Sequence, residues 1–324
     1  MKGEFMFSVV VTDSRFSSYD IEKEVFANIA AELVVFKNSL DEGWAEAVQQ
    51  ADALLVNQTQ ITKEIIDSLE NCKVISRYGI GYDNVDVSAA SSKGIPVCNV
   101  PDYCVDETAE HALALMFSCL RRVTTIDSLV RSGGWNSNTE LEVLKLRGKT
   151  LGIIGLGTIG REFARRCGSL GFSRILYTNQ SGSQPEDIPQ SAELTSLDTL
   201  LQSADIISVH LPLTEETKGL LGKKEIDSMK PNAILINTAR GGIVDENALG
   251  SALADRRIFA AGLDVYADEP ISPDSPLLAL HNVVLTDHVA YYSEESLREL
   301  KSQTAKNAAA VLSGKAPVNK VNEF

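Results

Sequence analysis

The segment 150–160, with the sequence TLGIIGLGTIG, constrains the fold more than any other part of the chain. An apolar run at 150–154 leads into Gly155, Gly157 and Gly160, which form the pattern G-x-G-x-x-G at the start of a helical pattern. The first glycine permits a tight turn, the second lets the backbone approach a pyrophosphate, and the third lets helix and strand pack closely. A lone pattern of this kind often marks only a turn. Here the strand, the turn and the helix follow in the required order, so the segment predicts a dinucleotide-binding loop with the helix N-terminus facing the phosphates.

Short apolar runs alternate with helical patterns on both sides of a break near Gly133 and Gly134, which favours parallel sheets covered by helices on both faces. The first set predicts helices from about Asp20 to Ala31 and from Thr62, and strands at 7–12, 33–36, 53–56 and 74–76. The second set predicts a helix closed by Gly171 and six strands, at 150–154, 175–178, 205–209, 233–237, 260–264 and 283–286. Six such strands make a complete doubly wound nucleotide domain.

At 324 residues the chain is long for a single core, which indicates two domains. A long helix begins near Glu107 with Asp106 as its N-cap, and the helical tail from about Ser293 returns to the first domain. The predicted fold class is α/β, with two doubly wound parallel-sheet domains. A Rossmann dinucleotide-binding domain (106–290) is inserted in a discontinuous flavodoxin-like substrate domain (1–105 and 291–324).

Composition excludes several classes of function. A net charge of −14 argues against a nucleic-acid partner, because most of the surface would repel a phosphate backbone. No apolar run approaches the roughly 18 residues that span a bilayer, and the N-terminus lacks the features of a secretory signal. The five cysteines form no C-x-x-C pair and no metal-ligand spacing with histidine, so we expect free thiols, no metal and a cytoplasmic protein.

Three polar groups follow predicted strands of the second domain, at the sheet edge where ligands of open α/β folds bind. They are Arg240, Glu269 and His288. A guanidinium grips a carboxylate through two parallel hydrogen bonds, and a histidine held by a carboxylate keeps its proton near neutral pH. Each residue alone is more often a surface or structural group. Their combination beside a phosphate loop predicts an active site.

Several motifs together resemble the D-isomer-specific 2-hydroxyacid dehydrogenases. They are the glycine loop and the segments RYGIGYDNVD (77–86), HLPLTEET (210–217), NTARGGIVD (237–245), DVYADEP (264–270) and TDHVA (286–290). These motifs extend over nearly the whole chain in order. The segments NVPDYCVDETAE (99–110) and GGW (133–135) are most similar to the C-terminal-binding-protein-like branch of that family.

The resemblance implies reversible reduction of a 2-oxo acid to a D-2-hydroxy acid by hydride from a nicotinamide dinucleotide. Arg240 would bind the substrate carboxylate and polarise the oxo group, His288 would protonate the carbonyl oxygen, and Glu269 would hold His288. Asp264 and the backbone near Thr238 would position the nicotinamide carboxamide. The residues assigned to the cofactor are Gly155, Gly157, Thr158, Ile159, Gly160, Asn179, His210, Pro212, Thr238, Ala239 and Asp264. Those assigned to the substrate are Tyr78, Gly79, Ile80, Gly81 and Arg240, with the loop 79–81 read as a nest of backbone N–H groups.

Some positions depart from the family pattern. Asn179 replaces the acid that usually binds the ribose hydroxyls, and Gln180 and Ser181 are able to donate to a 2′-phosphate, so both NAD and NADP stay possible. Asp287 stands where proline usually precedes the histidine. We expect no C-terminal regulatory domain. His210 is interpreted as structural or cofactor-adjacent, and His111 and His281 as structural.

Two other functions stay open: a dinucleotide-sensing regulatory protein of the C-terminal-binding-protein type, and a phosphite dehydrogenase. A formate dehydrogenase is disfavoured, because it would carry glutamine at position 269. Asn57, Gln58 and Thr59 are expected to face the cleft between the domains and to select a small or polar 2-oxo acid such as glyoxylate, hydroxypyruvate or pyruvate. Closure of that cleft on the ligand would exclude water. The resemblance also implies a homodimer built on the helix from Glu107 and the segment through Trp135.

Overall fold

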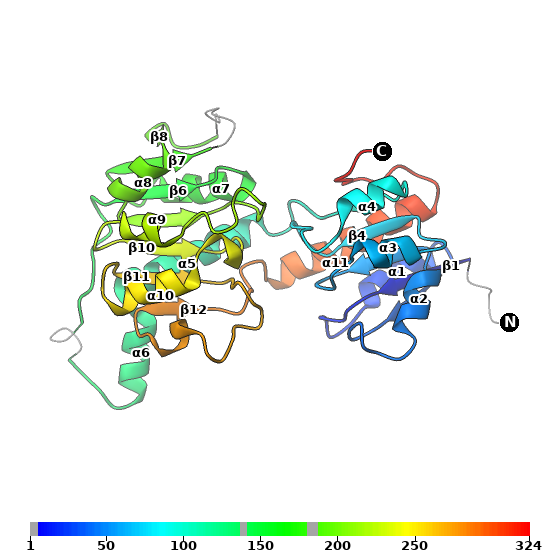
Figure 1. The fold of residues 1–324 in the computed structure, drawn as a ribbon, viewed down its shortest axis with the longest axis horizontal. Coiled ribbons are helices and arrows are strands. Elements are labelled where there is room, and N and C mark those ends of the chain that lie inside the picture. Colours follow the sequence, from blue (N-terminus) through cyan, green and yellow to red (C-terminus); the bar gives the residue numbers. More distant parts are fainter. Residues whose placement is uncertain (1–5, 137–140, 180–186) are drawn as a thin grey trace. The chain divides into compact units, whose positions relative to one another are not determined.

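The computed structural model describes residues 6–136, 141–179 and 187–324, and its chain divides into two compact units. Unit 1 comprises Met1–Tyr103 and Ser293–Phe324, and unit 2 comprises Cys104–Tyr292. Each unit is built around one parallel sheet (Figure 1).

Unit 1 holds a five-stranded sheet in the order β2-β1-β3-β4-β5, in which every pair of neighbours is parallel. Its strands are β1 (Phe7–Val11), β2 (Ala31–Val35), β3 (Ala53–Val56), β4 (Val74–Arg77) and β5 (Val97–Cys98). Its helices are α1 (Asp20–Ala27), α2 (Trp44–Gln50), α3 (Lys63–Ser68), α4 (Val87–Ser92) and α11 (Glu294–Leu312). This strand order is that of the flavodoxin-like fold.

Both faces of this sheet are covered. On one face α1 and α11 enclose a core that includes Phe26, Leu300 and Leu312. On the other face the side chains of Trp44, Ile66 and the α4 alanines pack against Leu54 and Ile75. The strand β3 (ALLV) is therefore a continuous apolar run, as expected for a parallel sheet that is buried on both sides.

Unit 2 holds a seven-stranded parallel sheet in the order β12-β11-β10-β9-β6-β7-β8. Its strands are β6 (Thr150–Ile154), β7 (Arg174–Thr178), β8 (Ala192–Leu194), β9 (Ile206–Val209), β10 (Ile234–Asn237), β11 (Ala260–Leu263) and β12 (Val283–Leu285). Its helices are α5 (Val105–Arg121), α6 (Val123–Arg131), α7 (Thr158–Cys167), α8 (Leu197–Ser203), α9 (Lys223–Asp227) and α10 (Glu246–Ala254), with short 3-10 helices η2 (Gly241–Ile243) and η3 (Pro276–Ala279). The direction of connection reverses at β6, which makes this a Rossmann sheet and confirms the predicted fold class.

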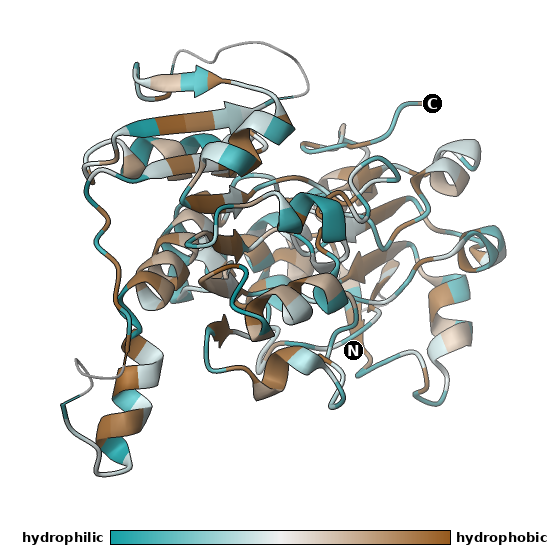
Figure 2. Ribbon diagram, turned by 60° about the vertical axis from the view of Figure 1, so that its left-hand side comes forward, coloured by the Kyte–Doolittle hydropathy of each residue, from teal (hydrophilic) through white to brown (hydrophobic). Residues whose placement is uncertain are grey.

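Two apolar layers flank this sheet, and the hydropathy colouring of Figure 2 shows apolar strands between the helices. One layer joins α5 and α7 to the sheet, and the other joins α8, α9 and α10 to its opposite face. Gly262 of β11 lies against α5 so closely that an added Cβ would meet the side chain of Leu115 at 2.9 Å. Within the described residues, no helix has both the length and the apolar character that spanning a membrane requires.

The structure corrects several predicted elements. The first helix ends at Ala27 and not at Ala31, because Ala30 adopts a left-handed conformation (φ 52°) and Ala31 pairs with Phe7 in the sheet. The cap of α5 is Cys104, and Asp106 lies in the first turn, where its charge favours the helix dipole. The helix after the glycine loop ends at Cys167, before Gly171.

The prediction also did not place the helices α2, α4 and α6 or the strands β5 and β8. The strands β5 and β8 are only two and three residues long, so they show no periodicity. With β8 the second sheet has seven strands in place of six. The helix α6 was not predicted, and it ends just before the predicted break at Gly133. It follows directly on α5 through Arg122, whose left-handed conformation (φ 54°) separates the two helices.

Candidate active site

The glycine loop has the predicted geometry. Gly155 follows β6 with φ 93°, and a Cβ there would meet the carbonyl oxygen of His210 at 2.6 Å. A Cβ on Gly160 would meet the carbonyl oxygen of Gly155 at 2.2 Å, so close packing of α7 on the turn requires glycine. Gly157 faces open space, and Thr158 and Ile159 form the first turn of α7. The backbone is thus open at Gly157, where a pyrophosphate has to approach.

The loop after β10 offers a second set of groups that fits a dinucleotide. The side chain of Asn237 accepts from the amide of Ala239 at 3.0 Å and donates to the carbonyl of Arg240 at 2.9 Å, which fixes the loop. Thr238 is 8% exposed, and among the described residues its Oγ1 has no hydrogen-bond partner. A buried hydroxyl without a partner is costly unless a ligand supplies one, so Thr238 fits a bound cofactor.

His210 has a structural contact of its own. Its Nε2 lies 2.8 Å from the Oγ of Ser208, and its ring lies 5.0 Å from the ring of Phe163. Enclosure of the imidazole lowers its pKa to about 3, so the ring is neutral at physiological pH. A neutral ring next to the glycine loop serves packing and not proton transfer.

The two other predicted cofactor residues follow strands β7 and β9. The carbonyl of Pro212 accepts from Thr217 Oγ1 at 2.6 Å, which holds the segment after His210 in place. Asn179 directly follows β7 and is partly buried. Gln180 and Ser181 lie outside the described residues.

His288 and Glu269 form a close pair. Nδ1 of His288 lies 2.6 Å from Oε2 of Glu269, and Oε1 of Glu269 accepts from the amide of Tyr266 at 3.1 Å. Burial raises the pKa of Glu269, but the hydrogen bond and charge of His288 outweigh burial and, with the Tyr266 amide and the Arg240 charge, bring the pKa below its ordinary value. The carboxylate is therefore ionised near neutral pH and accepts the Nδ1–H of His288. Because Nδ1 is paired with Glu269, Nε2 is the nitrogen of His288 that is left to exchange a proton with a substrate.

Arg240 lies on the loop that packs directly against the loop of Glu269. A Cβ on the next residue, Gly241, would meet the backbone carbon of Tyr266 at 1.9 Å, so the two loops touch through a glycine. Arg240 also donates from Nη1 to the carbonyl of Ala239 at 2.8 Å. The structure thus brings Arg240, Glu269 and His288 together at one edge of the sheet, after β10, β11 and β12.

Asp264, for which a contact with the nicotinamide was predicted, lies beneath the loop of His288. Its side chain is fully buried and accepts from Thr286 Oγ1 at 2.6 Å and from the amides of Val289 and Ala290 at 3.0 and 2.8 Å. Its carbonyl accepts from the amide of His288 at 2.8 Å. Asp264 therefore holds the histidine loop from beneath.

Sequence reasoning did not identify two groups that support this loop. Nε2 of His111, on α5, lies 2.9 Å from Thr286 Oγ1. The hydroxyl of Tyr266 donates to the carbonyl of Thr286 at 2.7 Å. Tyr266 stands within the motif 264–270 and His111 directly follows the motif 99–110, but nothing in their spacing indicates that they converge on position 286.

In unit 1 the predicted substrate loop follows β4. The side chain of Tyr78 is 2% exposed, and its hydroxyl donates to Oε1 of the buried Glu22 at 3.1 Å. The amide of Gly79 already donates to the carbonyl of Arg77 at 3.1 Å. An anion at this loop would therefore depend on the amides of Ile80 and Gly81.

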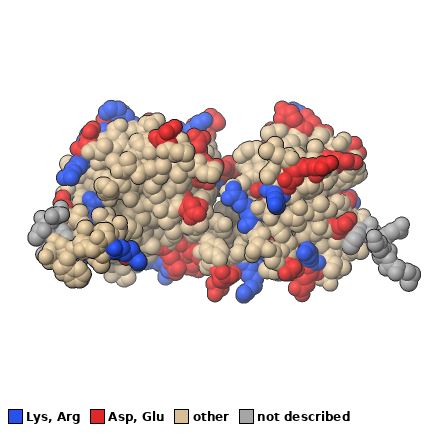
Figure 3. Space-filling view, turned by 90° about the horizontal axis from the view of Figure 1, so that it is seen from below, with Lys and Arg blue, Asp and Glu red and all other residues tan. Residues whose placement is uncertain are grey.

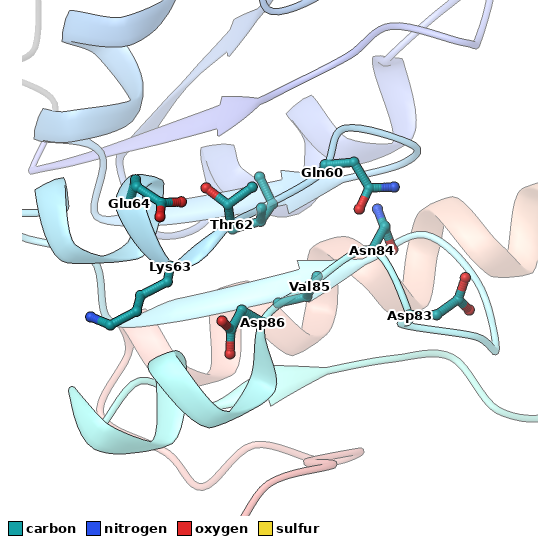
Figure 4. Close-up of a pocket in the computed structure, with 9 residues that line it drawn as sticks. Gln60, Thr62, Lys63, Glu64, Asp83, Asn84, Val85 and Asp86 are labelled. Atoms are coloured by element: carbon teal, nitrogen blue, oxygen red, sulfur yellow. The ribbon is translucent and has the colours of Figure 1, made fainter. Parts of the chain in front are cut away.

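A cavity of about 360 Å³ lies in unit 1 between the segment 60–64 and the turn 83–86 (Figure 4). Its lining is polar, and it contains none of the predicted catalytic residues. Among the described residues, no cluster of three or more His, Cys, Asp and Glu side chains is placed to hold a metal ion.

Comparison with known proteins agrees with this geometry. Residues 113–290 match the model of the D-isomer specific 2-hydroxyacid dehydrogenase, NAD binding domain. The chain is 41% identical to a glyoxylate reductase of Thermococcus litoralis over 86% of each protein. It is 42% identical to a D-3-phosphoglycerate dehydrogenase of Archaeoglobus fulgidus over 85% of this chain, but spans only 52% of that relative.

A solved structure shows the same fold. The D-lactate dehydrogenase from Aquifex aeolicus, complexed with NAD and lactic acid, superposes with a TM-score of 0.89 at 28% identity, over 98% of this chain and 99% of that one. The chain therefore belongs to the D-isomer-specific 2-hydroxyacid dehydrogenase family of NAD(P)-dependent oxidoreductases, and unit 2 contains its NAD-binding domain.

Proposed function

We propose that this chain reduces a small 2-oxo acid to the corresponding D-2-hydroxy acid. The observation that carries the proposal is the 2.6 Å contact between His288 and Glu269 next to the Arg240 loop. A bound nicotinamide dinucleotide supplies the hydride that reaches the carbonyl carbon. The chain itself binds the acid, polarises the carbonyl and delivers a proton to its oxygen.

Each catalytic residue has a distinct part in this proposal. The Arg240 guanidinium pairs with the substrate carboxylate and draws electron density toward the carbonyl oxygen. His288 gives its Nε2 proton to that oxygen as the hydride arrives. Glu269 stays ionised, fixes the ring through Nδ1 and stabilises the charged imidazole, as its lowered pKa supports. In the reverse direction the same groups remove the hydroxyl proton.

The glycine loop Gly155–Gly160, which includes Thr158 and Ile159, would bind the pyrophosphate. The loop of Thr238 and Ala239 would bind the nicotinamide half of the dinucleotide. Asn179 would contact the adenine ribose, and as a neutral residue it is compatible with either NAD or NADP. On unit 1 the amides of Ile80 and Gly81 would bind the substrate carboxylate, and Asn57, Gln58 and Thr59 would select its side chain. The polar character of these three residues favours glyoxylate, hydroxypyruvate or pyruvate.

We also propose a cytoplasmic homodimer that binds no nucleic acid. The five cysteines are free thiols, as in proteins of reducing compartments. Figure 3 shows Asp and Glu side chains on the surface of both units, in keeping with the net charge of −14. The helix α6 buries none of its side chains and leaves Val123 and Val130 about half exposed, which supports a partner on this helix.

The test is oxidation of NADH and of NADPH, followed by absorbance, with glyoxylate, hydroxypyruvate and pyruvate. We expect turnover with at least one acid. In His288→Ala, kcat should fall by about three orders of magnitude, and the dinucleotide affinity, measured by fluorescence, should be unchanged. Dinucleotide binding without turnover would instead support the sensing function. Reduction of NAD by phosphite would support the inorganic donor.

A further inference from the structure

The sheet of unit 1 has its own point of reversal. From β1 the chain passes to β2 at one edge of the sheet, and from β3 it passes through β4 to β5 at the other edge. The direction of connection therefore reverses between β1 and β3. Ligands of open α/β sheets bind past the carboxyl ends of the strands at such a point. Two segments meet there: Thr12 and Asp13 follow β1, and residues 57–59 follow β3.

Asp13 joins these two segments. Its carboxylate accepts from three successive amides, those of Asn57 at 3.1 Å, Gln58 at 2.7 Å and Thr59 at 3.2 Å. The hydroxyls of Thr12 and Thr59 donate to the same carboxylate at 2.8 and 2.9 Å. Asp13 is only 8% exposed, and its carboxylate accepts from these five protein donors. Such a carboxylate fixes a loop far more firmly than a neutral acceptor does.

The same loop is held from its other side by Asn84. The amide nitrogen of Asn84 donates to the carbonyl of Asn57 at 3.2 Å and to that of Thr59 at 2.9 Å. Asn84 is also 8% exposed, and Figure 4 shows its side chain directed toward Gln60. The backbone carbonyl of Asn84 accepts from the backbone amide of Ile61 at 2.8 Å. The amides of residues 57–59 thus point to Asp13 and the carbonyls of 57 and 59 to Asn84, which leaves the exposed Gln58 side chain to point outward.

We propose that Asp13 is a positioning residue for 2-oxo acid binding: its buried carboxylate sets the conformation of the loop 57–59 that presents Gln58 to the substrate. The proposal rests on the proposed function, in which this loop selects the acid. Asp13 itself touches neither substrate nor cofactor. Because its donors are all backbone or hydroxyl groups of unit 1, its loss should weaken binding of the acid and leave dinucleotide binding in unit 2 unchanged.

Asparagine at position 13 is the informative substitution. It keeps the size of the side chain but replaces one acceptor oxygen with an NH2 group, which would face amide donors and repel them. Thr59→Val is a milder second variant, because it removes one of the five donors and keeps the shape. Thr59 belongs to the substrate loop itself, whereas Asp13 lies outside the catalytic constellation, the cofactor loop and the loop 57–59, so Asp13→Asn is the decisive variant.

The chain offers a matched control in Asp52. Its carboxylate accepts from the amide of Ser8 at 2.9 Å and contacts Lys73 Nζ at 3.2 Å. Like Asp13 it links β1 to β3, but at the opposite end of the two strands, away from the carboxyl edge. Asp52→Asn therefore removes a similar contact between the same strands without touching the loop 57–59.

The experiment measures KM for the 2-oxo acid, kcat, dinucleotide affinity and backbone amide exchange in the four proteins. For Asp13→Asn we expect KM to rise at least about 10-fold, kcat and dinucleotide affinity to change less than about 2-fold, and amides 57–59 to exchange faster. Thr59→Val should show the same pattern at about 3-fold in KM. Asp52→Asn should change none of these quantities.

The outcomes separate the two proposals. Normal exchange at 57–59 in Asp13→Asn would overturn the inference, whatever the activity. Faster exchange with unchanged KM would overturn the role in substrate binding, while the reductase itself stays established. A wild-type protein that turns over no 2-oxo acid would contradict the proposed function, and the exchange data would still decide whether Asp13 holds the loop.

Discussion

The charge of Glu269 controls how His288 behaves. The carboxylate pairs with Nδ1, and its pKa lies below the ordinary value chiefly because the contact with His288 outweighs burial. A side chain whose pKa is lowered by folding stabilises the folded state above its ordinary pKa. That contribution is lost as the pH falls through the lowered pKa. The pair is therefore intact across the neutral range.

Replacing Glu269 with Gln tests this pairing. The imidazole then loses the negative charge that favours its protonated form, so 2-oxo acid reduction should fall about 10- to 100-fold at pH 7 or above. The alkaline limb of the pH–rate profile should move to lower pH. Asp268→Asn, a change in the exposed neighbouring acid, serves as control and should leave the profile in place. An unmoved limb in Glu269→Gln would contradict the pairing.

His210 should also make stability depend on pH, and with the same sign as Glu269. Its pKa is lowered from 6.5 to about 3 in the folded chain, so between these values the unfolded chain binds a proton that the folded chain does not. Stability should therefore decline as the pH falls from about 6.5 toward 3. His210→Gln should flatten that decline, as urea unfolding at several pH values will show. A wild-type His210 NMR signal that titrates near pH 6.5 would contradict this account.

At the scale of elements, the sequence predicts what depends on local pattern. The strand–turn–helix of the glycine loop is correct because its requirements are local: Gly155 has a positive φ of 93°, and a Cβ on Gly160 would meet the carbonyl oxygen of Gly155. The three catalytic candidates converge because parallel strands end at one edge. The enclosure of Asp264 and the inward direction of Tyr78 depend on partners 22 to 56 residues away, Thr286 and Glu22, that no local pattern identifies. The predicted C-terminal end of α1 was wrong for a similar reason, because the pairing of Ala31 in the sheet overrides helix propensity.

The helix α6 carries apolar side chains at i, i+3 and i+7, namely Val123, Ile126 and Val130. If this row forms the proposed dimer contact, Val130→Asp should raise the dimer dissociation constant at least about 10-fold, because it buries a charge. Sedimentation equilibrium measures the change. Ser128→Asp, on the opposite side of the same helix, should leave association unchanged. A monomeric wild-type chain would contradict the homodimer.

At the scale of the whole molecule, the reactivity of the cysteine thiols reports whether both units are folded. Burial raises the pKa of Cys72, Cys98, Cys119 and Cys167 to about 12, and Cys104 is only 3% exposed. A thiol reagent at pH 8 should therefore label at most the partly exposed Cys72 in the native protein, and all five cysteines in urea. Rapid native labelling of two or more thiols would show that one of the units opens readily.

The return of α11 to unit 1 has a consequence for how the chain is made. Leu300, Ala305, Ala308 and Leu312 complete the core of unit 1, whereas every residue of unit 2 precedes Ser293. During synthesis the ribosome delivers the whole of unit 2 before the helix that closes unit 1. The second unit is thus able to fold while the chain is still attached, and the first must wait for release of the last thirty or so residues. Unit 1 therefore begins before unit 2 in the order of synthesis and is completed after it.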